Sequence, residues 1–119
     1  MDIADLEVFL EAENRRLVET LDGLTRENIP LAQTVKLSEE VGEVCRAVLA
    51  AEDLQRDRNE EGAQDVGPEG AQDVGPEGAQ DVGQEVADVV ITSLLLAKTL
   101  EIDIEAALER KIARIEDRY

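Results

Sequence analysis

The sequence predicts an all-α protein, a four-helix protomer that assembles as a dimer or a tetramer. Apolar residues recur at steps of three and four over most of the chain, which is the spacing of one helix face. The one cluster of β-branched residues lies inside an apolar run that is too long for a strand. The chain has 119 residues, which is enough for one core and too few for two. We therefore expect residues 1–119 to form a single helical domain.

Two helices are expected in the first half of the chain. The first spans residues 3–21, and Gly23 ends it. Asn28 and Pro30 have the residue types of a cap and first turn for the second helix, which weakens near Arg56. Its apolar positions include Cys45, the only cysteine. We interpret Cys45 as a small buried hydrophobe, with a reactive thiol as the alternative.

Two further helices are expected in the second half. A run from about Gln84 to Leu100 is apolar on nearly every side, so this helix should be central rather than amphipathic. Asp103 is the expected cap of a last helix that runs to the C-terminus. The third helix has more apolar surface than three partners of this length can cover. This excess predicts a homodimer or homotetramer that buries it across a symmetric interface.

An octapeptide, EGAQDVGP, occurs three times between residues 61 and 84, with Gln84 in place of the last proline. Each copy has two glycines, and two of the copies end in proline, so the segment disfavours both helix and strand. We predict that residues 61–84 form a flexible, solvated loop between the second and third helices, produced by tandem duplication. A partner-binding motif is the alternative.

The composition excludes several classes of function. The 29 acidic and 12 basic residues give a formal charge of −17, which opposes binding to nucleic acid or to anionic membranes. No apolar run approaches the roughly 20 residues of a membrane helix, and the N-terminus lacks a signal-peptide pattern. We therefore expect a cytoplasmic protein. The absence of histidine and the single cysteine exclude histidine-based catalysis and the usual zinc sites.

Acidic residues gather on one face of the second predicted helix. Lys36, Glu40 and Glu43 share a face because steps of three and four residues return to the same side of a helix. Glu39 lies beside them. In a chain this acidic, a solvated surface would also explain the group.

The third predicted helix carries two acids one turn apart, Glu85 and Asp88. The presence of Glu85 would also be explained by its position in the first turn, because acids are favourable at the positive end of the helix dipole. Asp88 interrupts an apolar run, so we predict that it is buried, at a cost of roughly several kcal/mol that Lys, Arg or a metal must compensate. If the two helices pack antiparallel, four carboxylates can converge: Glu40, Glu43, Glu85 and Asp88. Such oxygen ligands suit Mg²⁺ or Mn²⁺, and Mg²⁺ often bridges carboxylates to phosphates, which points to a nucleotide or pyrophosphate substrate.

The segment KLSEEVGEV followed by EVADVV resembles the EExxE and ExxD signature of MazG-like all-α nucleoside triphosphate pyrophosphohydrolases. The similarity extends over most of the chain outside the repeat. It implies a four-helix protomer, obligate dimers and a house-cleaning role in the nucleotide pool. The implied reaction is the Mg²⁺-dependent cleavage of a nucleoside triphosphate between its α and β phosphates, which yields the monophosphate and pyrophosphate. The interval between the two motifs is longer than is usual in the family, and two extra octapeptides account for the excess.

The resemblance also implies a role for each matching position. The ligands of Mg²⁺, or alternatively Mn²⁺, would be Glu40, Glu43, Glu85 and Asp88. Glu39 would orient or deprotonate the attacking water. The groups that contact phosphate oxygens would be Lys36, Lys111 and Arg118.

Two departures from the family pattern bear on the substrate. Ile115 lies where many members have asparagine, and only Phe9 and Tyr119 are available to stack on a base, so the base preference stays open. A phosphoribosyl-ATP pyrophosphohydrolase fits less well because the third helix lacks the DLLYH-like text of those enzymes. The alternatives to an active enzyme are a non-catalytic helical interaction module and an inactive family member. Asp88 inside the apolar run favours the enzyme over the module.

Overall fold

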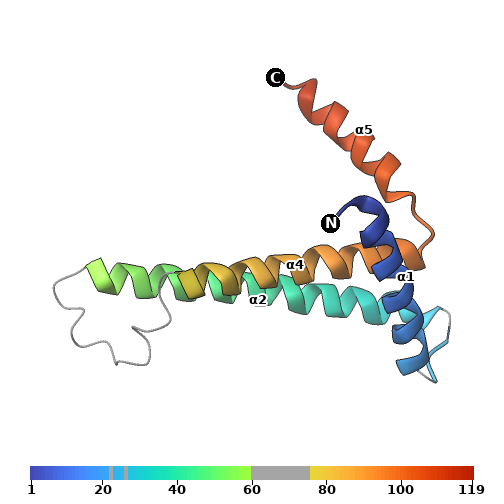
Figure 1. The fold of residues 1–119 in the computed structure, drawn as a ribbon, viewed down its shortest axis with the longest axis horizontal. Helices are drawn as coiled ribbons and strands as arrows, with labels where there is room; N and C mark the ends of the chain where they lie inside the picture. The colour runs from blue at the N-terminus through green and yellow to red at the C-terminus, as the bar shows by residue number, and fades with distance from the viewer. Residues whose placement is uncertain (22, 26, 60–75) are drawn as a thin grey trace. The chain divides into compact units, whose positions relative to one another are not determined.

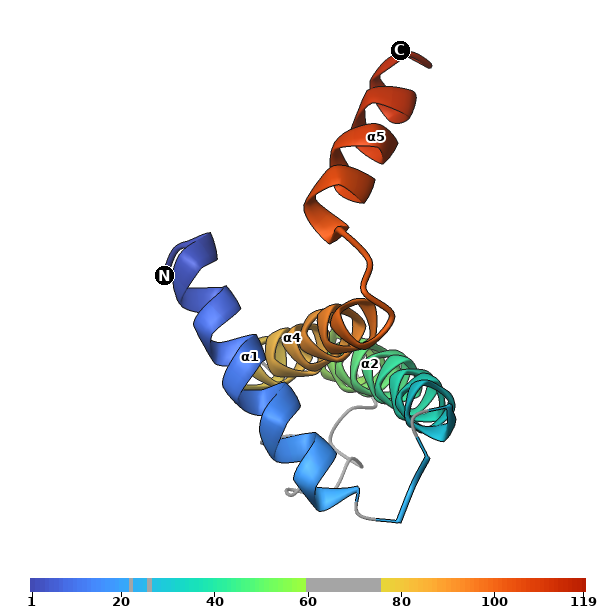
Figure 2. The same ribbon diagram turned by 90° about the vertical axis from the view of Figure 1, so that its right-hand side faces the viewer.

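The computed structural model describes residues 1–21, 23–25, 27–59 and 76–119, with the backbone alone described for 54–59 and 76–80. These residues form helices and no strand, which confirms the all-α fold class (Figures 1 and 2). The helices are α1 (Ile3–Thr20), α2 (Asn28–Asn59), α4 (Pro76–Thr99) and α5 (Ile104–Glu116). The chain divides into two compact units, to which α2 and α4 both contribute. Unit 1 comprises Met1–Lys36 and Ile91–Tyr119, and unit 2 comprises Leu37–Val90.

Unit 2 consists of the later part of α2 and the first part of α4. These two segments run antiparallel and lie side by side, as the colour gradient along them in Figure 1 shows. The predicted antiparallel packing is therefore correct in this unit. A pair of helices buries only the faces that meet, and the apolar residues off that face, such as Val41 and Leu49, are exposed. Cys45 is exposed for the same reason, so the prediction that it is buried was wrong.

Helix α4 begins at Pro76, about eight residues earlier than predicted. The third octapeptide copy, residues 77–84, is therefore helical, and the loop prediction is wrong for these residues. The rest of the predicted loop, 61–75, lies outside the described residues. Proline suits the first position of a helix, where its missing N–H has no partner to lose. Val82 is half-buried, so packing extends into this copy and offsets the roughly 1 kcal/mol that each glycine costs a helix.

Unit 1 contains α1, the first turns of α2, the last turns of α4, and α5. Its buried residues come from three of these helices: Leu10 from α1, Gln33 from α2, and Leu95 and Ala97 from α4. The Nζ of Lys98 on α4 also lies 3.7 Å from a carboxylate oxygen of Glu11 on α1. Apolar packing and this ion pair together hold α1 against the end of α4.

The ends of α1 and α5 follow the local sequence signals, whereas Asn28, the predicted cap of α2, is the first residue of that helix. Asp2 caps α1 by accepting a hydrogen bond of 2.9 Å from the backbone N–H of Asp5. The backbone N–H of Ala106 donates to Asp103 over 3.1 Å, which confirms the predicted cap of α5. Helix α1 ends at Thr20, and Gly23 follows with a φ of +93°, a conformation that glycine adopts without strain. The cap of α5 and the end of α1 were predicted, because a few neighbouring residues determine them.

Apolar surface remains on the outside of the single chain. Three apolar side chains are buried among the described residues, whereas Val86 and Val90 on α4 are exposed, as the excess of apolar residues on this helix suggested. No described helix is both long and apolar enough to cross a membrane.

Candidate metal centre

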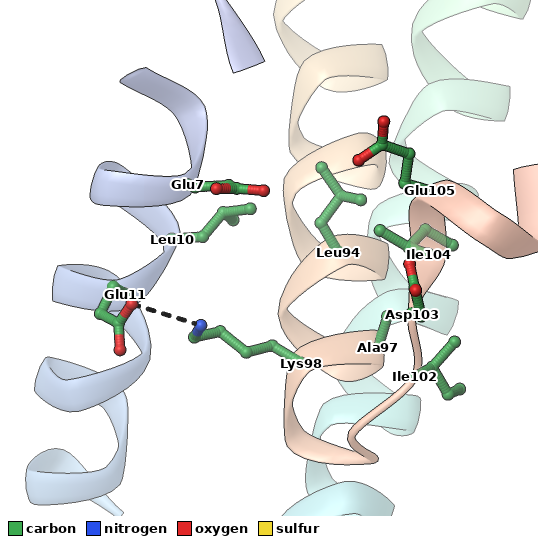
Figure 3. Close-up of a pocket in the computed structure, with 10 residues that line it drawn as sticks. All are labelled: Glu7, Leu10, Glu11, Leu94, Ala97, Lys98, Ile102, Asp103, Ile104 and Glu105. Carbon is green, nitrogen blue, oxygen red and sulfur yellow. Dashed lines mark ion pairs between the residues drawn. The ribbon is translucent and has the colours of Figure 1, made fainter. Parts of the chain in front are cut away.

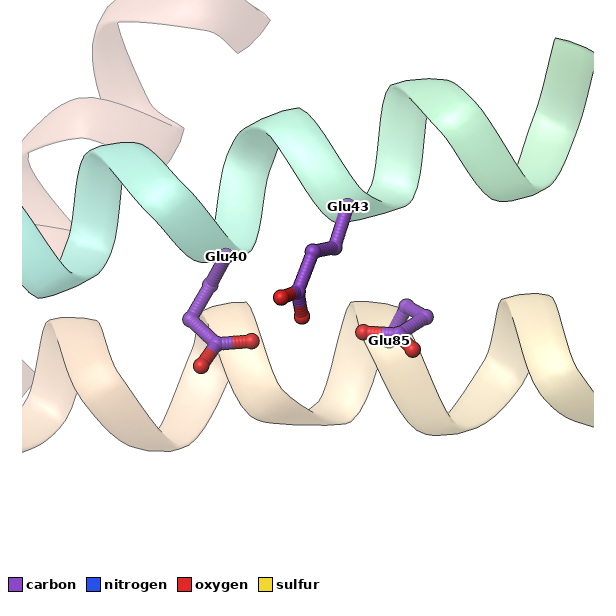
Figure 4. A group of neighbouring side chains, drawn as sticks. All are labelled: Glu40, Glu43 and Glu85. Atoms are coloured by element: carbon purple, nitrogen blue, oxygen red, sulfur yellow. The ribbon is translucent and has the colours of Figure 1, made fainter.

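Three glutamates converge in unit 2, where α2 faces α4 (Figure 4). Glu40 and Glu43 extend from α2, and Glu85 reaches toward them from α4. One carboxylate oxygen from each residue lies within 4.8 Å of the corresponding oxygens of the other two. We call these three residues the glutamate cluster. All three were predicted as metal ligands from the sequence.

Helix geometry explains how the cluster forms. Glu40 and Glu43 are three residues apart, so they project from the same face of α2 on successive turns. The antiparallel course of α4 then brings Glu85 opposite both of them. The burial of the three side chains differs: Glu40 is 7% exposed, whereas Glu43 and Glu85 are half-buried. The cluster is thus open enough to admit a ligand and buried enough to limit the screening of its charges by water.

The electrostatics of the cluster favour a cation. The negative charge of Glu40 raises the pKa of Glu43 above its ordinary value, and partial burial and the charge of Glu85 add to the increase. The Oε2 atom of Glu85 is buried and accepts no hydrogen bond. A buried acceptor without a donor costs roughly 1–3 kcal/mol, and more when it is charged. A positive ion among the three carboxylates would relieve both the repulsion and this cost.

The donor set fits a hard divalent ion. Carboxylate oxygens are the ligands that Mg²⁺ and Mn²⁺ prefer, and the cluster contains no nitrogen or sulfur ligand. Mg²⁺ commonly binds to only a few protein carboxylates and completes its shell with water and substrate phosphates. Three glutamates, two of them only half-buried, match that requirement.

The profile of the MazG nucleotide pyrophosphohydrolase domain matches residues 30–119. The chain belongs to the MazG family. The match includes all three residues of the glutamate cluster. No curated protein and no solved structure matches the chain significantly.

Asp88 differs from the expectation drawn from the sequence. It lies one turn after Glu85 on α4, but it is exposed, so the prediction that it is a buried carboxylate was wrong. It is also outside the glutamate cluster. The apolar run that surrounds it in sequence does not enclose it, because α4 contacts α2 along only one face in unit 2. The role of Asp88 as a fourth ligand in this MazG domain stays a prediction.

The other predicted site residues are distributed over the chain. Glu39 is exposed on α2, next to Glu40 in sequence. Lys36, Lys111 and Arg118 are exposed and belong to unit 1, whereas the glutamate cluster belongs to unit 2. The roles of these four residues in water activation and phosphate binding stay predictions.

One feature of this MazG domain was not predicted from the sequence. Unit 1 has a cleft of about 380 Å³ that is lined from α1, the end of α4 and the start of α5 (Figure 3). No periodic pattern could reveal it, because residues almost a hundred positions apart line it together.

Proposed function

We propose that this protein is a Mg²⁺-dependent nucleotide pyrophosphohydrolase. It cleaves a nucleoside triphosphate between the α and β phosphates and releases the monophosphate and pyrophosphate. The observation that carries this proposal is the convergence of Glu40, Glu43 and Glu85 in a chain of the MazG family. The proposed role is the removal of unwanted nucleotides from the cytoplasmic pool.

Each residue has a definite task in this proposal. The residues that would hold the ion are the glutamate cluster and Asp88. Because Asp88 lies outside the cluster, its side chain would have to move, or to act through a water, to take part. When bound, Mg²⁺, or Mn²⁺ in its place, neutralises charge on the phosphates and on the pyrophosphate leaving group. Glu39 takes a proton from the attacking water. The phosphate oxygens bind to Lys36, Lys111 and Arg118, because ammonium and guanidinium groups match them in charge and hydrogen bonding.

The proposed assembly is a homodimer or a homotetramer. The support is the amount of apolar side chain that a single chain leaves in water, for instance at Leu31, Val35 and Leu49 on α2. Large contiguous apolar surfaces mark interaction sites on soluble proteins. A symmetric interface would remove these side chains from water.

The first experiment tests metal binding and turnover together. The melting temperature with Mg²⁺ or Mn²⁺ should be several degrees higher than the melting temperature in EDTA. A ligand at a concentration of 100 times its Kd stabilises a fold by about 2.7 kcal/mol. A panel of nucleoside triphosphates, scored for pyrophosphate release, should then identify the base. Metal binding without any release of pyrophosphate would instead indicate an inactive family member.

Two substitutions test the assignment of the ligands. Glu43→Gln and Asp88→Asn should each abolish most of the metal-dependent rise in melting temperature and lower turnover by at least about 10²-fold. Glu52→Gln is the matched control, because Glu52 is an exposed glutamate on the same helix outside the cluster. Turnover at the wild-type rate in Asp88→Asn would remove Asp88 from the site and leave the three glutamates as the candidates.

A further inference from the structure

The cleft in unit 1 has an apolar floor and a charged rim (Figure 3). Its apolar lining residues are Leu10, Leu94, Ala97, Ile102 and Ile104. Leu10 and Ala97 are buried and form the floor. Ile102 and Ile104 are 47% and 37% exposed, so apolar surface in the cleft is in contact with water. An occupant that covers this surface gains hydrophobic free energy.

The rim of the cleft is mostly acidic. Its charged lining residues are Glu7, Glu11, Lys98, Asp103 and Glu105. Four of the ten lining residues are therefore carboxylates, against one amine. All four acids are exposed, which places them on the solvent side of the floor.

Two of these acids have partners within the fold, and two do not. The Nζ of Lys98 lies 3.7 Å from Glu11, and Asp103 accepts the hydrogen bond that caps α5. Among the described residues, neither Glu7 nor Glu105 forms a hydrogen bond or an ion pair. The negative charge of the rim is thus compensated in one part of the cleft only.

The two unpartnered carboxylates reach the cleft from different helices. In Figure 3, Glu7 extends from α1 and Glu105 from the start of α5, with Leu94 between them. Carboxylates attract positive charge and accept hydrogen bonds from N–H donors. The cleft therefore offers charged hydrogen-bond acceptors at its edges and apolar contact between them.

These two features together select the occupant. A metal ion would compensate the carboxylates but leave the apolar floor in water, and a neutral apolar molecule would do the reverse. A quaternary ammonium group has no N–H to donate, and none of the ten lining residues is aromatic, so the cage that recognises such groups is missing. A primary ammonium group on an aliphatic chain meets both requirements.

We propose that the cleft binds a small primary aliphatic amine. Its methylene chain lies on Leu10, Leu94 and Ala97, and its ammonium group donates hydrogen bonds to Glu7 and Glu105. The cleft has a volume of about 380 Å³, within the range of about 300–1,000 Å³ that is usual for small-molecule sites. The charge complementarity between the ammonium group and the unpartnered acids is the observation that selects this class of ligand.

This binding site is separate from the proposed hydrolysis. None of its ten lining residues is a proposed metal ligand, a proposed base or a proposed phosphate-binding residue. Amine binding can therefore be measured on the full-length, metal-free protein without nucleotide. A protein that binds the amine and hydrolyses no nucleotide would support the amine site and contradict the hydrolysis, and the opposite result would do the reverse.

Hexylammonium is the probe, and its Kd can be measured by isothermal titration calorimetry. At about 0.15 M salt the Debye length is about 8 Å, so exposed acids outside the cleft contribute little. We expect saturable binding of one molecule per chain. The controls are 1-hexanol, which lacks the charge, and hexyltrimethylammonium, which lacks the N–H donors. Each should bind at least about 10-fold more weakly.

Two substitutions test the carboxylates, each with a matched control. Glu7→Gln and Glu105→Gln should each raise the Kd for hexylammonium at least about 5-fold, because glutamine keeps the size of the side chain and removes its charge. The controls are Glu19→Gln on α1 and Glu109→Gln on α5, since both are exposed glutamates that do not line the cleft. Both controls should bind as the wild type does, and all four variants should keep its melting temperature.

Two further measurements test the apolar surface of the cleft. Butylammonium is two methylenes shorter than hexylammonium and should bind about 10-fold more weakly. Ile102→Ser should weaken the binding of hexylammonium, whereas Val18→Ser, at a position of equal exposure on α1 outside the cleft, should not. Three results would overturn the proposal: no saturable binding, wild-type Kd values in both Glu7→Gln and Glu105→Gln, or 1-hexanol binding as tightly as hexylammonium.

Discussion

At the scale of one residue, Glu43 shows how the charges of the glutamate cluster affect one another. Its carboxylate is near those of Glu40 and Glu85, and these negative charges raise its pKa. In the unfolded chain the same group titrates at its ordinary value, about 4.3. The folded, metal-free protein therefore binds more protons than the unfolded chain as the pH rises above that value.

This difference predicts a pH dependence of the metal-free protein. When the folded state binds more protons than the unfolded state, the free energy of unfolding falls as the pH rises. In EDTA we expect the free energy of unfolding to fall as the pH rises from about 4.3 through the raised pKa of Glu43. Urea denaturation at a series of pH values would measure this.

The matched variants isolate the contribution of Glu43. Glu43→Gln should reduce the fall, because glutamine has no proton to lose, whereas Glu52→Gln should leave it as in the wild type. An equal fall in Glu43→Gln and in the wild type would assign the pH dependence to the general acidity of the chain.

Glu39 and Glu40 are neighbours in sequence with different proposed roles, and this makes them a useful pair. Glu39 is exposed, whereas Glu40 is buried in the cluster. If Glu39 activates water, Glu39→Gln should lower kcat by about 10²-fold or more while the Kd for Mg²⁺ stays near the wild-type value. Glu40→Gln should instead weaken Mg²⁺ binding. A large rise in the Kd of Glu39→Gln, measured by calorimetry, would make Glu39 a ligand rather than a base.

At the scale of the elements, the end of α4 stores a small strain. Glu101 has a φ of +57°, a left-handed conformation that residues with a Cβ rarely adopt. It allows the backbone N–H groups of Glu101 and Ile102 to donate to the carbonyls of Lys98 and Ala97, over 3.1 and 2.9 Å. These two bonds close the helix immediately before the cleft in unit 1.

Glycine at this position should therefore stabilise the protein. Glu101→Gly should raise the free energy of unfolding by about 0.5–1 kcal/mol, because glycine adopts a positive φ without a steric cost. Glu101→Ala is the control: alanine removes the same charge but keeps the Cβ, and it should give no such gain. Chemical denaturation would compare them. An equal gain in both variants would indicate that the charge of Glu101, not its backbone, is unfavourable.

The elements also show how far the sequence could predict this fold. The cap at Asp103 and the end of α1 before Gly23 were predicted correctly, because adjacent residues determine them. The helical state of residues 77–84 was not, because the low helix propensity of Gly78 and Gly83 argues against it in the sequence. The existence of the helices could thus be predicted from periodicity, whereas the start of α4 could not be predicted from local propensity.

The candidate site likewise has features that the sequence could predict and features that it could not. The glutamate cluster was predicted because a spacing of three residues fixes Glu40 and Glu43 on one face, and two antiparallel helices have few ways to meet. The exposure of Cys45 and Asp88 was not predictable, because it depends on which helix faces are covered by a partner.

For the molecule as a whole, the octapeptide repeat sets the length of the connection within unit 2. Helix α2 ends at Asn59 and α4 begins at Pro76, so 16 residues join two antiparallel helices. Removing one copy, residues 61–68, leaves eight, and helix–helix connections of two to eight residues are common. Removing two copies, residues 61–76, leaves only Glu60 and takes Pro76 out of α4. One residue cannot reverse the chain, so the ends of both helices would have to unwind.

The two deletions should therefore behave differently. Halving a connection changes its closure free energy by only about 0.6 kcal/mol, so deleting 61–68 should leave the melting temperature and its rise with Mg²⁺ close to the wild type. Deleting 61–76 should lower the melting temperature in EDTA, because unwound turns lose their backbone hydrogen bonds and packing. It should still retain part of the response to Mg²⁺, since Glu85 lies more than two turns inside α4. If the deletion of 61–68 alone abolished the response to Mg²⁺, the repeat would be part of the metal centre, and its description as a connection would be wrong.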